Sequence, residues 1–113
     1  MAGIDDTRNG MVKSQWSEAG IEFRSNLAAE VGCEIVLHSH SYDHVSFVTY
    51  GLFSVKEVMP SGEKKEYLMA SKGYPTEKET VGCRVLIPKF HQHSFVLLEA
   101  VSQPGEVLCI WAE

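Results

Sequence analysis

The chain has 113 residues, of which 44% are hydrophobic and 22% charged, and this balance is that of one ordinary globular domain. Its net charge is −5, and its basic residues are scattered except for the pair Lys64-Lys65, which acidic residues flank on both sides. Nucleic-acid-binding surfaces need clustered positive charge, so we exclude a nucleic-acid partner. No apolar run approaches the roughly 20 residues that span a bilayer, so we expect no membrane partner.

The amino-terminal residues are polar and acidic, without the apolar core of a secretory signal. We expect residues 1–15 to form an arm, either flexible or packed on a partner subunit, and residues 16–113 to form a single domain. The three cysteines, Cys33, Cys83 and Cys109, lie far apart in apolar segments and form no C-x-x-C motif. We therefore expect reduced, buried thiols in a cytoplasmic protein.

From Ile21 onward, short apolar segments alternate with residues that favour turns. No segment carries the i, i+3, i+4, i+7 apolar pattern of an amphipathic helix over a useful length. The segments Val55–Met59 and Glu66–Met69 flank Gly62 and predict a hairpin. Eight short strands indicate an all-β sandwich or small barrel. The expected strands are Ile21–Arg24, Cys33–His40, Val45–Tyr50, Leu52–Met59, Glu66–Ala70, Arg84–Ile87, Ser94–Ala100 and Val107–Ala112.

All five histidines fall into two groups, H-S-H-S-Y-D-H at residues 38–44 and H-Q-H at residues 91–93, each beside an apolar segment. Side chains two residues apart on a strand point to the same face. Two such groups that face each other across a barrel would surround one transition-metal ion. The alternative is that these histidines are surface groups or satisfied core side chains. The apolar flanks disfavour it, because several polar rings would then be buried without partners.

The spacing around both groups resembles the two sequence motifs of the cupin superfamily. Residues 32–51 match G-x5-H-x-H-x3–4-E-x6-G, and residues 82–97 match G-x5-P-x-G-x2-H-x3-N. Three positions differ from these motifs: His44 stands in place of Glu, Phe90 in place of Gly and Leu97 in place of Asn. With histidine at position 44, the chain resembles the four-histidine cupins, a subset that includes manganese-binding small bacterial proteins.

The resemblance implies an all-β fold, the double-stranded β-helix or jelly-roll barrel of the cupin type. It also implies a homodimer, because cupins of this size are commonly dimers. The implied cofactor is one divalent transition metal (Mn, Fe, Ni or Zn). Four neutral ligands leave such an ion with its full charge, so we expect it to attract anionic or chelating oxygens of a small-molecule ligand. The implied metal ligands are His38, His40, His44 and His93.

Strand alternation places further residues beside these ligands. If His93 faces inward, Phe95, Leu97 and Glu99 share its face while the strand stays regular, and His44 likewise shares its face with Val48 and Tyr50. We expect Val48, Phe95 and Leu97 to wall an apolar substrate pocket. The acid–base candidates are Tyr50 and Glu99, although each is also a satisfactory wall or surface residue. His91 is expected to contact substrate, with a hydrogen bond to a ligand or an exposed loop position as alternatives.

The chain has no G-x-S-x-G, P-loop or G-x-G-x-x-G motif, so serine-hydrolase and nucleotide-binding functions lack support. The favoured function is a metalloenzyme that acts on a small chelating oxygen-containing molecule, as a dioxygenase or as a Lewis-acid isomerase or cyclase. Two alternatives stay open. One is a non-catalytic module that binds a metal or a small ligand, and the other is a scaffold protein.

Overall fold

The computed structural model describes residues 7–8 and 10–112, and these residues form strands, turns and loops. In this part of the chain, no helix is long and apolar enough to cross a membrane. The strands are β1 (Thr7–Arg8), β2 (Met11–Glu18), β3 (Ile21–Ala28), β4 (Glu34–His38), β5 (His44–Tyr50), β6 (Leu52–Val58), β7 (Lys64–Ala70), β8 (Arg84–Ile87), β9 (Gln92–Glu99) and β10 (Gly105–Ala112).

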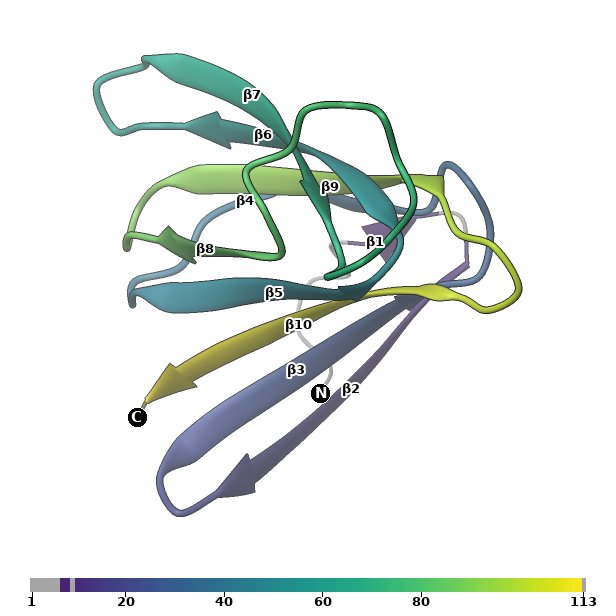
Figure 1. The fold of residues 1–113 in the computed structure, drawn as a ribbon. Helices are drawn as coiled ribbons and strands as arrows, with labels where there is room; N and C mark the ends of the chain where they lie inside the picture. Colours follow the sequence, from purple (N-terminus) through teal and green to yellow (C-terminus); the bar gives the residue numbers. More distant parts are fainter. Residues whose placement is uncertain (1–6, 9, 113) are drawn as a thin grey trace.

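The strands form two five-stranded antiparallel sheets that face each other (Figure 1). The first sheet has the order β1-β4-β9-β6-β7, and the second has the order β2-β3-β10-β5-β8. From β3 to β6 the chain passes from one sheet to the other with each successive strand, as it does again from β8 to β10. This arrangement confirms the all-β jelly-roll barrel that the sequence predicted.

The hydrophobic core lies between the two sheets. The first sheet contributes Phe53, Phe95 and Leu97, and the second contributes Val48 and Val107, all at most 1% exposed. Burial of an aliphatic or aromatic side chain of this size is worth about 1.5–3 kcal/mol. These side chains lie in the middle and at one end of the strands, which leaves the other end of the barrel for polar residues.

All eight expected strands are present, with bounds that differ by a few residues. The expected hairpin around Gly62 is also present, because β6 and β7 pair from Leu52↔Ala70 to Val58↔Lys64. Two further strands, β1 and β2, begin within the segment expected to be an arm. Strand β2 runs through residue 15 without a break and pairs with β3 along its whole length. Its alternation is weak because every residue after Met11 is exposed. Residues 1–6 and 9 of the expected arm lie outside the described residues.

Two of the three cysteines are buried, as the sequence predicted. Cys33 and Cys109 are buried, Cys83 is partly buried, and none of the three forms a disulfide within the described chain. Cys109 lies on β10 opposite Ser46 of β5, close to the histidine-bearing end of the barrel.

Candidate metal centre

His38 reaches the interior of the barrel through an irregularity in β4. In the ladder between β4 and β9, Ile35 pairs with Phe95 and His38 pairs with His93, so three steps on β4 oppose two on β9. Regular alternation would place His38 on the face opposite to the buried Ile35. The extra residue acts as a β-bulge and returns the histidine to the inner face.

His40 lies in the loop that follows β4, and His44 lies directly after it. The strand expected to reach residue 40 ends two residues earlier, so His40 lies in the loop, and His44 is the first residue of β5. The second histidine segment is attached to this loop by two hydrogen bonds. The Phe90 N–H donates to the His40 carbonyl at 2.8 Å, and the Lys89 N–H donates to Oδ1 of Asp43 at 2.8 Å. These bonds join two segments that lie about 50 residues apart in the sequence.

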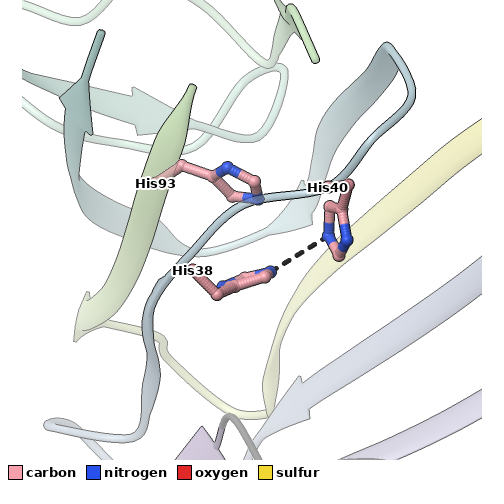
Figure 2. A group of neighbouring side chains, drawn as sticks. All are labelled: His38, His40 and His93. Carbon is pink, nitrogen blue, oxygen red and sulfur yellow. Dashed lines mark hydrogen bonds between the residues drawn. The ribbon is translucent and has the colours of Figure 1, made fainter. Parts of the chain in front are cut away.

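The imidazoles of His38, His40 and His93 converge on one place (Figure 2). One ring nitrogen from each lies within 4.8 Å of the others, and Nε2 of His38 is 3.1 Å from Nε2 of His40. The His44 ring lies beside this group, with its centroid 4.8 Å from that of His93 and 5.3 Å from that of His40. The structure therefore brings together all four histidines that the sequence singled out.

The spacing of these nitrogens fits a metal ion. Two nitrogens bound at about 2.1 Å to one ion, at right angles to each other, lie about 3.0 Å apart. The separation of 3.1 Å between the His38 and His40 nitrogens matches this value. The largest spacing in the group, 4.8 Å, is only slightly above the roughly 4.2 Å between ligands on opposite sides of an ion.

His44 provides a second observation in favour of a metal. Its residue is 2% exposed, its Nε2 lies 3.1 Å from Oγ of Ser46, and its Nδ1 is buried without a hydrogen-bond partner among the described residues. Burial, and then electrostatic interactions with His93, His40, His38 and Arg24, lower its pKa to about 3. The ring is therefore neutral at physiological pH, which is the form that binds metal ions.

A buried carboxylate that the sequence analysis missed lies next to the histidines. Glu57 on β6 pairs with His93 on β9 and is 1% exposed. Its Oε2 is 2.6 Å from Nδ1 of His91, its Oε1 accepts a 3.0 Å hydrogen bond from the Tyr67 hydroxyl, and Lys65 Nζ lies 3.7 Å from Oε1. The sequence signal was its alternation with buried Val55, which places a charged residue on the inner face of β6.

A small cavity lies beside the three converging histidines. Its volume is about 10 Å³, close to the least that holds one water molecule. Strand β3 contributes the polar residues Arg24 and Asn26 to its wall. The expected strand ended at Arg24, so the sequence analysis did not extend the inward alternation to Asn26. The lining residues are Arg24, Asn26, Ile35, His38, His40, His93, Phe95 and Cys109.

The acid–base candidates Tyr50 and Glu99 do not reach the histidines. Each lies six residues along its strand from the nearest predicted ligand, a distance of about 20 Å. Each also follows a register shift, between Val48 and Tyr50 on β5 and between Leu97 and Glu99 on β9, so the alternation that aligned them inward is broken. Glu99 is exposed and accepts a 2.7 Å hydrogen bond from Tyr74, whose ring packs against that of Tyr50.

The residues expected to wall a substrate pocket do not all lie in the same place. Phe95 lines the small cavity, whereas Val48 and Leu97 are packed into the hydrophobic core at 0% and 1% exposure. The expected apolar pocket walled by all three is therefore filled by core packing. His91, the expected substrate contact, is held by Glu57, with 20% of its side chain exposed.

Comparison with known proteins supports the fold. Oxalate decarboxylase from Bacillus subtilis, described with Mn(II) centres, superimposes with a TM-score of 0.64 at 17% sequence identity, over 83% of this chain and 21% of that chain. A conserved protein of unknown function from Streptococcus pyogenes superimposes with a TM-score of 0.60 at 14% identity, over 91% of this chain and 74% of that chain. The chain thus spans about a fifth of the decarboxylase. No protein-family model and no curated protein matches the sequence.

Proposed function

We propose that this protein is a small metal-binding cupin of the four-histidine type, in which His38, His40, His44 and His93 hold one divalent transition-metal ion. The observation that carries the proposal is the convergence of one ring nitrogen each from His38, His40 and His93 within 4.8 Å. The buried Nδ1 of His44 adds support, because a buried polar atom without a partner costs free energy that an ion would recover. The manganese named for the decarboxylase makes Mn a first candidate, beside Fe, Ni and Zn.

We further propose that the protein is a metalloenzyme acting on a small chelating molecule that bears oxygen, as a dioxygenase or as a Lewis-acid isomerase or cyclase. A bound ion would supply Lewis acidity toward such oxygens. The chain itself supplies a small cavity beside the histidines, and Arg24 and Asn26 are among the residues that line it. The Tyr67–Glu57–His91 network holds a carboxylate beside His93.

A second candidate function is a module that binds a metal or a small ligand without turnover. The small size of the cavity, about 10 Å³, favours this candidate, because little room remains beside an ion. Substrate-free protein with exchangeable water ligands on the ion would favour the enzyme. A closed site with four imidazole ligands would favour storage or a structural role.

The test is the metal content of protein purified without an affinity tag or added metal, measured by elemental mass spectrometry. We expect close to one ion per chain in the wild type and loss of the ion in the double variant His40→Ala/His93→Ala. His91→Ala is the matched control, because it removes a histidine that Glu57 already holds. A well-folded wild type that contains no metal and takes up none of the added Mn, Fe, Ni or Zn would refute the proposal.

A further inference from the structure

Arg24 lines the cavity beside the histidines. Its Nε donates a 3.2 Å hydrogen bond to Oε1 of Gln15, and its guanidinium lies 5.2 Å from the centre of the Trp111 ring. These two contacts fix the side chain. Within residues 7–8 and 10–112, no carboxylate forms an ion pair with it. The nearby Glu22 accepts a 2.9 Å hydrogen bond from Ser17 instead.

Asn26 lines the same cavity and carries an unsatisfied acceptor. The residue is 2% exposed, and its Nδ2 donates a 3.2 Å hydrogen bond to the carbonyl of Val107. That bond fixes the orientation of the amide, because a flipped group would set oxygen against oxygen. Its Oδ1 is buried without a partner among the described residues. A hydrogen-bond donor from outside the chain would satisfy this buried acceptor.

The two side chains form a matched pair. Arg24 and Asn26 are two residues apart on β3, so they share one face and lie about 7 Å apart along the strand. The same cavity wall contains His38, His40 and His93. With an ion bound by neutral imidazoles, the site would hold two positive centres, the ion and Arg24, and would favour an anion between them.

From this arrangement we propose that the ligand of the site is a small 2-hydroxycarboxylate, selected by Arg24 and Asn26. The carboxylate pairs with the guanidinium of Arg24, and the 2-hydroxyl donates a hydrogen bond to Oδ1 of Asn26. The inference rests on the proposed function, since the oxygens of this ligand also face the ion. Arginine recognises carboxylates through paired hydrogen bonds.

The test is calorimetric titration of manganese-loaded protein with three small molecules of matched size. Glycolate carries both groups, glycolamide lacks the charge, and acetate lacks the hydroxyl. We expect glycolate to bind at least roughly tenfold more tightly than either analogue, because a site built around a polar group rejects the analogue that lacks it. This comparison uses the wild type alone, so it holds even where a variant fails to fold.

Variants test which residue causes the preference for glycolate over glycolamide and which causes the preference over acetate. We expect Arg24→Gln to weaken glycolate binding at least roughly tenfold and to remove the preference over glycolamide. Asn26→Leu should remove the preference over acetate. Arg84→Gln, which changes an exposed arginine on β8, is the matched control and should bind glycolate like the wild type. Manganese stoichiometry is measured on the same samples, and it should stay near one in all three variants.

The outcomes separate the two proposals. Equal affinity for glycolate and its analogues in manganese-loaded wild type, or unchanged glycolate binding in a folded Arg24→Gln variant, would overturn the ligand assignment and leave the metal site standing. Failure of the wild type to bind manganese or any other divalent transition metal would overturn both.

Discussion

The backbone N–H of Phe90 donates a 2.8 Å hydrogen bond to the carbonyl oxygen of His40. This bond joins the loop that precedes His93 to the loop that contains His40, and the bond from Lys89 to Asp43 reinforces it. Two loops, each of which connects the two sheets, are thus held at a fixed separation. The spacing of the histidine rings therefore depends on the conformation of residues 88–91, which include none of the predicted metal ligands.

The conformation of Phe90 leads to a first prediction. Phe90 has φ +67° and is 55% exposed, so it occupies a left-handed backbone conformation without compensation from burial. Such a conformation costs an L-residue about 1–2 kcal/mol, and glycine avoids this cost while losing some chain entropy. We expect Phe90→Gly to stabilise the protein by about 0.5–1 kcal/mol, measured by thermal unfolding. Phe90→Ala keeps the left-handed penalty and should show no such gain. A lower melting temperature for Phe90→Gly would contradict this account.

A second prediction concerns the buried carboxylate of Glu57. It accepts a hydrogen bond from the Tyr67 hydroxyl, contacts His91 and lies near Lys65. Glu57→Gln removes the charge with little change in shape, so it weakens these contacts and leaves buried polar atoms poorly matched. We expect a loss of about 1–3 kcal/mol in the free energy of unfolding, measured with urea. Lys65→Met removes only the exposed partner and should cost less than about 1 kcal/mol. Equal effects of the two substitutions would show that burial of Glu57 is not what matters.

Tyr67 gives a pH-dependent prediction. Burial raises the pKa of its hydroxyl well above the usual 10, with further contributions from the charge of Glu57 and the hydrogen bond to it. The unfolded chain therefore loses this proton first as the pH rises, and stability falls above about pH 10. We expect the urea midpoint of the wild type to fall more between pH 9 and pH 11 than that of Tyr67→Phe, which lacks the ionising group. Parallel curves for the two proteins would remove Tyr67 from the explanation.

The edge strand β2 underlies a prediction about assembly. It has one strand neighbour, and its side chains from Val12 to Glu18 are exposed on both faces, including Trp16 at 43%. An exposed edge strand is a template for pairing with another chain. We predict a homodimer through this strand, with a mass in light scattering of twice the 12.6 kDa of one chain. Val12→Lys should shift the mass toward the monomer. A wild-type mass near 12.6 kDa at micromolar concentration would refute the dimer.

The fold was predictable to a large extent because its signals are local. Strand alternation and turn residues located eight strands, and the motif glycine Gly51 has φ +101°, a conformation that favours glycine. Strand β2 was not found, because a strand exposed on both faces carries no hydrophobic alternation. The four-histidine grouping was predictable because all its members lie within two short motifs.

The remainder of the site depends on pairing between strands, which the sequence of one strand does not encode. Glu57 lies beside His93 only because β6 and β9 are neighbours in that register. Arg24 lies beside the histidines only because its part of β3 is at the same end of the barrel as they are. Glu99 and Tyr50 were assigned to the site by an alternation that register shifts interrupt. A shift of one residue reverses the face of every side chain beyond it, and no compositional signal marked either shift.

The irregularity in β4 makes the site sensitive to strand shape and tolerant of strand length. If substitutions straightened β4 at constant length, Leu37 would occupy the position opposite His93, and the imidazole of His38 would turn to solvent. Deletion of Leu37 would instead produce a regular ladder in which the same histidine still faces His93. Homologous chains with one residue fewer in this strand would therefore preserve the centre, whereas a redesign that idealised the backbone alone would abolish it with every histidine still present.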